Sequence, residues 1–154
     1  MESSTALNVR SQEEKSGCLT IVSSAAAEYI QRGYTKLPDG TFQITKLISR
    51  FGNSVGKNRF WYEPFRSDIL VNVDFNLDDG KDGIKIIKSA GHSDDSMSII
   101  VDNEIAIVGD LMFGIFRNSI FLPYADNISE MIKSWSKLLN TDCNIFLPGH
   151  GREI

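Results

Sequence analysis

Two histidines and one aspartate each stand at the end of an apolar segment. His92 follows Gly91 in a Gly-His-Ser turn, Asp110 closes an apolar run in Gly-Asp, and His150 lies in a Pro-Gly-His-Gly sequence after a third apolar run. Neutral imidazoles and carboxylates are side chains that bind zinc in proteins. Strand ends are also where an open sheet gathers its functional groups. The pattern therefore predicts metal-capable side chains at the edge of a sheet.

Three short apolar segments must position these side chains. Ile99–Val101 and Ile105–Ile107 are separated by Asp102-Asn103, which is typical of a tight hairpin turn. The third segment, Asn144–Leu147, leads directly to His150. Each segment is rich in isoleucine, valine or phenylalanine, the residues that favour strands.

The helix with the clearest signal is predicted over Asn127–Asn140. Asn127, followed by Glu130 three residues later, resembles a capping box. Six apolar residues recur at the spacing of one helix face: Ile128, Met131, Ile132, Trp135, Leu138 and Leu139. We expect this face to be buried, so that the helix acts as scaffold for the last strand and for His150.

The first part of the chain predicts one strand and one helix. Cys18–Ser23 is a short β-rich run that we interpret as a buried strand. Ser24 is placed to cap a helix over Ala25–Arg32, and Gly33 follows at the position where a left-handed residue ends a helix. Residues 1–16 are polar and are expected to be poorly ordered or helical at their end.

The middle of the chain gives weaker signals. Leu37–Gly40 resembles a turn, and Thr41–Phe51 is predicted to be a short helix. Gly52–Phe65 is a loop rich in glycine and aromatic residues, with Phe60, Trp61 and Tyr62 either packed in a core cluster or forming a lid.

Two further strands are expected before the Gly-His-Ser turn. Ile69–Val73 and Ile84–Ile87 are separated by Asp78-Asp79-Gly80, which predicts a tight connection between them. Leu111–Tyr124 is interpreted as an apolar loop. Strands alternating with few helices predict an α/β fold in which helices are layered on sheets.

Composition limits the class of protein and its partners. The 154 residues fit one domain, and the net charge of −4 argues against a nucleic-acid partner or an anionic membrane. No apolar run approaches the roughly 18–20 residues of a membrane span, and no secretory signal is visible. Cys18 and Cys143 have no paired spacing and are expected to be reduced core residues. These observations predict a cytoplasmic protein without a membrane partner.

The three motifs together resemble the C-terminal part of the metallo-β-lactamase superfamily. The residues that carry the resemblance are Gly91-His92-Ser93 with Ser96, the strand that closes in Gly109-Asp110, and the terminal Pro148-Gly149-His150-Gly151, in that order. The match extends from about Ile69 to the end of the sequence. The resemblance implies a partial αββα sandwich, with the whole chain, 1–154, as a single N-terminally truncated domain.

The resemblance also implies a metal site and a chemistry. His92 would bind a first metal, Asp110 would bridge two metals, and His150 would bind the second. Zinc is the expected metal, with iron or manganese as alternatives. A metal-bound water, whose pKa falls toward about 7, would then hydrolyse an ester, a thioester, a lactone or a similar small substrate. Asp94 and Asp95 either add an oxygen ligand or cap the turn that holds His92.

The family's other metal motif, His-x-His-x-Asp-His, is missing because the sequence holds only two histidines. In an alignment that starts from the similarity of Asn8-Val9-Arg10 to the family's continuation, Glu2 and Thr5 stand at histidine positions and Ser4 at the aspartate. By the family's assignment each metal would keep one histidine and the shared Asp110, whereas stable sites use three or four protein ligands. Tight zinc binding and hydrolysis by this chain alone are therefore not expected.

Two hypotheses of different classes follow. In the first, the chain is the C-terminal portion of a metallo-β-lactamase-like hydrolase acting on a small molecule. In the second, it is an inactive half-domain that serves as an interaction or structural module. Because a bare sandwich half exposes an apolar face and open strand edges, we expect a homodimer, a complementary N-terminal half, or poor solubility.

Overall fold

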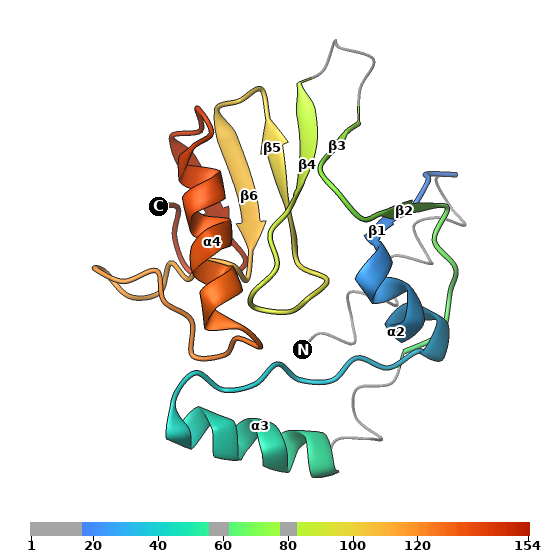
Figure 1. Cartoon of the computed structure of the whole chain (residues 1–154), viewed down its shortest axis with the longest axis vertical. Coiled ribbons are helices and arrows are strands. Elements are labelled where there is room, and N and C mark those ends of the chain that lie inside the picture. The colour runs from blue at the N-terminus through green and yellow to red at the C-terminus, as the bar shows by residue number, and fades with distance from the viewer. Residues whose placement is uncertain (1–16, 56–61, 78–82) are drawn as a thin grey trace.

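The computed structural model describes residues 17–55, 62–77 and 83–154 (Figure 1). In chain order the elements are β1 (Ile21–Ser23), a 3-10 turn (Ser24–Ala26), α2 (Ala27–Arg32), α3 (Gln43–Val55), β2 (Ile69–Val71), β3 (Phe75–Asn76), β4 (Ile84–Lys88), β5 (Met97–Val101), β6 (Ile105–Gly109), α4 (Ile128–Leu139) and β7 (Ile145–Pro148). The predictions for Glu2, Ser4, Thr5, Asn8, Phe60, Trp61 and the turn at 78–80 lie outside the described residues.

A five-stranded sheet forms the main layer of the molecule. Its strand order is β3-β4-β5-β6-β7, and only the β6–β7 pair is parallel. The predicted hairpin between β5 and β6 is confirmed, with Asp102 and Asn103 at φ values of 53° and 55°. Positive φ at both central residues is what a type I′ turn requires, and asparagine and aspartate tolerate it best among non-glycine residues.

Helix α4 lies against this sheet, beside β6 in Figure 1. The buried cluster between sheet and helix takes residues from β4, β5, β6, β7, α4 and the loop after β6: Ile87, Ile100, Ala106, Val108, Leu111, Met112, Leu122, Ala125, Met131, Leu138 and Phe146. The Asn127 side chain caps α4 by accepting a hydrogen bond from the Glu130 N–H at 3.1 Å. Half of the predicted capping box is therefore present, while the Glu130 carboxylate pairs with Lys133 instead.

The expectation that six apolar side chains of α4 are buried is wrong for three of them. Met131 and Leu138 are fully buried, and Trp135 packs against the core. Ile128, Ile132 and Leu139 are 38%, 49% and 68% exposed. The apolar face of α4 is thus wider than the surface that the sheet covers.

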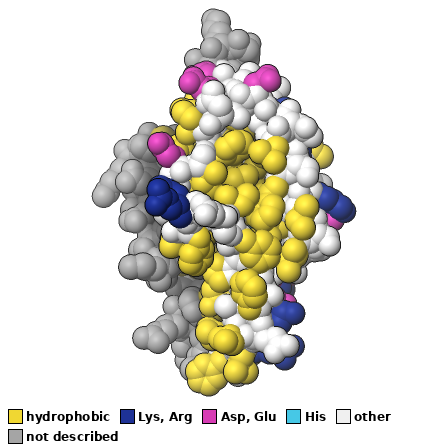
Figure 2. Space-filling model, turned by 90° about the vertical axis from the view of Figure 1, so that its left-hand side faces the viewer, with side chains coloured by type: hydrophobic (Ala, Val, Ile, Leu, Met, Phe, Trp, Pro, Cys, Tyr) yellow, Lys and Arg dark blue, Asp and Glu magenta, His cyan; other side chains and the backbone are white. Residues whose placement is uncertain are grey.

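The five-stranded sheet also has a second apolar face. Ile86, Ile99, Ile107 and Leu147 are cross-strand neighbours in register, on the side of the sheet opposite Ile87 and Ile100. Within this row Ile99 and Ile107 are 38% and 42% exposed. Figure 2 views the molecule from the side on which α4 lies in Figure 1, and it shows a broad area of apolar side chains with charged groups around its margin.

The strand pairing around β2 differs from the prediction. β2 pairs in parallel with β1 in a separate two-stranded sheet, and β3, which the sequence did not indicate, pairs with β4. The prediction assumed that neighbouring strands pair directly, whereas the chain leaves one sheet after Val71 and enters the other at Phe75. Asp68 fastens the small sheet, since its carboxylate accepts hydrogen bonds from the Thr20 N–H at 2.8 Å and hydroxyl at 3.0 Å. These two bonds hold the pKa of Asp68 below its usual value.

Several boundaries in the first part of the chain also shift. Cys18 is exposed and lies before β1, so its placement in the core is wrong, while Cys143 packs against the core as expected. The two cysteines do not form a disulfide. Ser23, rather than Ser24, accepts the capping hydrogen bond, and Gly33 ends α2 in the left-handed conformation as predicted.

The predicted short helix at residues 41–51 is present as α3, but it continues to Val55 into the segment expected to be a loop. α3 is the longest helix of the described residues, at 13 residues. Spanning a bilayer takes about 20 apolar residues, and no helix in the described ranges has that length and apolar character.

One polar clamp joins the sheet to α4. The Lys137 ammonium donates to the Asp74 carboxylate at 2.6 Å and to the Lys88 carbonyl at 3.1 Å, and the Lys88 N–H donates to Asp74 at 3.1 Å. Partial burial raises the pKa of Asp74, but the hydrogen bonds from Lys137 and Lys88 outweigh it and the pKa is lowered overall. The ionised form of Asp74 is therefore favoured by the folded state.

We expect Asp74→Asn to lower the free energy of unfolding by about 0.5–1 kcal/mol near neutral pH, because the clamp is partly open to solvent. A lowered folded-state pKa contributes stability above the unfolded-state pKa, and that contribution is lost as the pH falls through the folded-state value. Urea unfolding at about pH 7 and about pH 3 measures the free energy of unfolding with the Asp74 carboxyl ionised and with it largely protonated. Asp142→Asn, at an exposed position, is the control. An equal loss of free energy of unfolding in both variants would show that the Asp74 contacts do not stabilise the fold.

Candidate metal centre

A tight turn presents His92 between β4 and β5. Gly91 has a φ of 144°, and its N–H donates to the Ser93 carbonyl at 3.0 Å. The Ser96 hydroxyl accepts from the Ser93 N–H at 3.2 Å and lies 2.8 Å from the Ser93 hydroxyl. Ser96, rather than Asp94 or Asp95, thus makes the side-chain hydrogen bonds that close this turn within the described chain.

Helix α4 fixes the position of this turn. The Asn127 N–H donates to the Gly91 carbonyl at 2.9 Å, and the Ser134 hydroxyl donates to the Ala90 carbonyl at 2.7 Å. A Cβ on Gly91 would lie 2.3 Å from the Met131 Cα and 2.4 Å from its nitrogen. Glycine at this position therefore lets the turn pack directly on the helix backbone.

The ring of His92 is oriented by a backbone carbonyl. Its Nδ1 lies 2.9 Å from the Tyr124 carbonyl oxygen, which only accepts hydrogen bonds. Nδ1 therefore carries the proton in the neutral ring, and Nε2 keeps its lone pair. This is the arrangement that orients metal-binding histidines in proteins.

Asp110 lies between the two histidines. It follows Gly109 at the end of β6, and its Oδ2 is 3.9 Å from His92 Nε2 while its Oδ1 is 3.5 Å from His150 Nε2. Each carboxylate oxygen thus faces a different imidazole nitrogen. A Cβ on Gly149 would come within 2.5 Å of Asp110 Oδ1, so this glycine leaves room for the carboxylate.

His150 comes from the loop after β7 and is more open than His92. Its side chain is 59% exposed, and its ring lies against Phe113 with the centroids 5.6 Å apart. The His150 carbonyl accepts from the Gly114 N–H at 2.9 Å, which ties this loop to the chain after Asp110. Helix α4 also supports the segment after Asp110, because the Trp135 indole donates to the Leu111 carbonyl at 2.7 Å.

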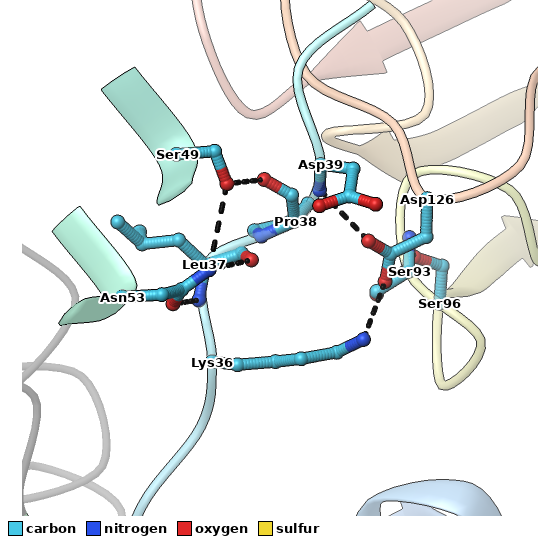
Figure 3. Close-up of polar contacts among 9 residues, drawn as sticks. All are labelled: Lys36, Leu37, Pro38, Asp39, Ser49, Asn53, Ser93, Ser96 and Asp126. Atoms are coloured by element: carbon cyan, nitrogen blue, oxygen red, sulfur yellow. Dashed lines mark hydrogen bonds and ion pairs between the residues drawn. The ribbon is translucent and has the colours of Figure 1, made fainter. Parts of the chain in front are cut away.

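A strap at residues 36–41, which the sequence patterns did not predict, holds the segment that orients His92 (Figure 3). Asp126 accepts a hydrogen bond from the Asp39 N–H at 2.8 Å and pairs with Lys36 at 3.8 Å. The Ala125 N–H donates to the Asp39 carbonyl at 2.7 Å, and the Asp126 N–H donates to the His92 carbonyl at 2.9 Å. The strap, the Tyr124 segment and the His92 turn therefore form one connected unit.

Tyr62, from the loop predicted to be a lid or a core cluster, is half-buried. Its hydroxyl lies 2.9 Å from the Thr35 hydroxyl. Burial raises the pKa of Tyr62, the hydrogen bond with Thr35 opposes the shift, and the charge of Asp95 raises the pKa further.

A cavity of about 550 Å³ lies beside His150. Phe113, which contacts the His150 ring, lines it together with Arg117, Ile120 and Arg152. The Arg152 guanidinium donates to the Arg117 carbonyl at 3.1 Å, which joins two residues of this lining. The lining of the cavity combines apolar side chains with two arginines and one carboxylate, that of Glu153.

The structure brings His92, Asp110 and His150 together, as the sequence pattern predicted, and their role as ligands stays a prediction. Their donor atoms suit zinc, which binds imidazole nitrogen and carboxylate oxygen at roughly 2.0–2.2 Å. Among the described residues, however, no group of three or more His, Cys, Asp or Glu side chains is arranged to hold one metal ion. The three residues therefore fit one side of a metal centre and do not complete it.

No family model matches the sequence. Solved structures of similar fold include an archaeal metallo-β-lactamase superfamily protein from Sulfolobus tokodaii, with a TM-score of 0.57, 18% identity, and coverage of 95% of this chain and 57% of that one. The B3 metallo-β-lactamase BLEG-1 matches with a TM-score of 0.60 and 15% identity, over 95% of this chain and 64% of that one. A metallo-β-lactamase family protein from Thermus thermophilus matches with a TM-score of 0.60 and 13% identity, over 92% of this chain and 49% of that one.

The present chain thus spans between 49% and 64% of the length of these three proteins. At identities below 20% the likeness establishes the fold. The predicted likeness to the metallo-β-lactamase fold and the α/β class are both confirmed at the level of the fold. The chain carries part of the metallo-β-lactamase fold.

Proposed function

We propose that this chain supplies one side of a dinuclear metal centre in a metallo-β-lactamase-like hydrolase. The observation that carries the proposal is the placement of the two oxygens of Asp110, each of which faces the Nε2 atom of a different histidine. A carboxylate in this position is suited to bridge two cations and to offset their mutual repulsion. His92 would hold one metal and His150 the other.

Zinc fits this donor set best, with iron or manganese as alternatives. When bound, the metals would supply a water of lowered pKa for hydrolysis. The chain's own residues have defined tasks: the Tyr124 carbonyl keeps the Nδ1 proton of His92 in place, and Asp110 shares its charge between the two sides. The cavity beside His150 would accept the acyl part of an ester, a thioester or a lactone.

Hydrolysis needs more ligands than His92, Asp110 and His150 supply. Catalytic zinc sites use about three protein ligands, and His92 or His150 with Asp110 gives two. The missing ligands would come from a complementary N-terminal half that carries the His-x-His-x-Asp-His motif. A cytoplasmic location is part of the same proposal, and two cysteines without a disulfide are compatible with the reducing environment there.

A second candidate function is that of a non-catalytic interaction module. It is favoured by the large apolar side chains that remain exposed on α3, α4 and the sheet. The two functions can be distinguished by supplying the missing ligands. If the chain is part of a hydrolase, replacing Asp110 then abolishes catalysis; if it is an interaction module, the replacement has no such effect.

A complementation assay tests the proposal. We expect the purified chain with zinc to hydrolyse a thioester or p-nitrophenyl ester no faster than free zinc does. Mixing it with a polypeptide that carries the N-terminal half of a fold relative, including the His-x-His-x-Asp-His motif, should restore turnover. The Asp110→Asn chain should not restore it, whereas Asp94→Asn should. Equal activity of the Asp110→Asn and unmodified mixtures would contradict the proposal and favour the interaction module.

A further inference from the structure

Helix α3 turns its polar side inward. Ser49 is 1% exposed, and its hydroxyl donates to the Pro38 carbonyl at 2.6 Å (Figure 3). The Asn53 amide oxygen accepts from the Leu37 N–H at 2.9 Å, and its nitrogen donates to the Leu37 carbonyl at 3.1 Å. These bonds fix the rotation of α3 about its own axis on the strap at residues 36–41.

The apolar side of α3 consequently faces solvent. Ile44, Leu47, Ile48 and Phe51, here called the α3 stripe, follow one another at the spacing of a single helix face and are 74%, 70%, 52% and 69% exposed. An amphipathic helix in a folded domain normally buries this side. α3 presents it to whatever lies outside the chain.

The α3 stripe is continuous with a second apolar surface on α4. Phe42, just before α3, packs edge-on against Phe121 at 6.0 Å between ring centroids, and Phe121 packs against Trp135 of α4 at 6.1 Å. On the same helix Ile128, Ile132 and Leu139, here called the α4 stripe, are the three apolar residues that the sheet leaves exposed. The aromatic rings thus connect the two stripes.

The size of this surface indicates its occupant. Seven apolar side chains at these exposures, with the rings between them, present on the order of 700–800 Å². The largest apolar patch on a typical monomer is about 300–600 Å², whereas a stable protein interface buries about 800 Å² on each partner. The surface is therefore large enough for a stable dimer.

We propose that a second copy of this chain docks on the α3 and α4 stripes and forms a two-fold dimer. The 13-residue α3 and the 12-residue α4 have matching lengths, about 20 Å and 18 Å. A two-fold axis allows α3 of each copy to lie along α4 of the other, so that one contact is made twice.

The α4 stripe is not on the face that a complementary N-terminal half would cover. Such a half would complete the sandwich on the face of the sheet that carries Ile99 and Ile107, opposite α4. The contact on α4 can therefore coexist with a completed sandwich, and the dimer does not depend on metal binding.

Sedimentation equilibrium of the full chain tests the proposal, with variants on each surface. We expect the unmodified chain to have the mass of a dimer at micromolar concentration. The double variant Leu47→Glu with Ile48→Glu should have half that mass, and Ile132→Glu on α4 should as well. Lys46→Glu, exposed on the polar side of α3, and Ile107→Glu on the sheet face should remain dimers.

Circular dichroism checks that each variant is folded, and if the double variant is not, Ile132→Glu carries the test alone. A monomeric unmodified chain would overturn the proposal and leave the surface to a different protein. Dimers that persist in both stripe variants, or that dissociate in Ile107→Glu alone, would also overturn it.

Discussion

Replacing Gly91 with alanine is expected to lower the free energy of unfolding by about 3–5 kcal/mol. The φ of 144° at Gly91 is a conformation that side chains rarely adopt, and the new Cβ would lie within 2.5 Å of three atoms of Met131. Two of those atoms are backbone of α4, which cannot move without breaking the helix. The cost therefore combines backbone strain with separation of the turn from α4.

Gly109→Ala is the matched control for this prediction. Gly109 also has a positive φ, 53°, but nothing lies within 4 Å of the position its Cβ would take. We expect it to cost only about 1 kcal/mol, the price of a left-handed conformation without a clash. Chemical denaturation of both variants measures the difference. Equal losses would show that α4 does not pack on the turn as described.

The second large effect is expected at Asp110. Replacing it with alanine should reduce the weak zinc binding expected of this chain to below detection, because one side chain would be lost from both sides of the centre. Loss of a residue that only orients a ligand typically weakens metal binding by about 10–100-fold, and a shared ligand should exceed this. Asp110 lies at a strand end that is partly open, so folding should be little affected.

Asp94→Asn and Asp95→Asn are the controls for the Asp110 prediction. Both carboxylates lie in the His92 turn, and neither makes the hydrogen bonds that close it in the described structure. Isothermal titration calorimetry should show that both variants bind zinc as the unmodified chain does. A loss as large as that of Asp110→Ala would instead assign one of them as a ligand, as the sequence had left open.

The sequence predicted the part of the fold that positions the candidate site. The hairpin at Asp102-Asn103, the cap at Asn127 and the strand before His150 all follow from local rules of turn chemistry, capping and periodicity. Each of these signals spans only a few residues. For that reason the three site residues could be placed at strand ends without knowledge of the tertiary structure.

The parts that the sequence did not predict depend on contacts between distant segments. Periodicity indicated that α4 has a wide apolar face, but not that Ile132 and Leu139 lie beyond the edge of the sheet. The strap at residues 36–41 is bonded to a segment more than 80 residues later, as in the Asp39–Asp126 contact. The outward-facing apolar side of α3 contradicts the usual rule, so no local pattern could have indicated it.

The central claim is that Asp110 joins two half-sites, one at each histidine, and nuclear magnetic resonance of the imidazole rings tests it most directly. The sequence has only two histidines, so His92→Ala assigns both sets of ring signals. On titration with zinc, we predict that the Nε2 signals of both rings shift in the unmodified chain and that neither shifts at the same zinc concentration in Asp110→Ala. Shifts that persist unchanged in Asp110→Ala, or an unmodified chain in which neither ring responds to zinc, would contradict the account.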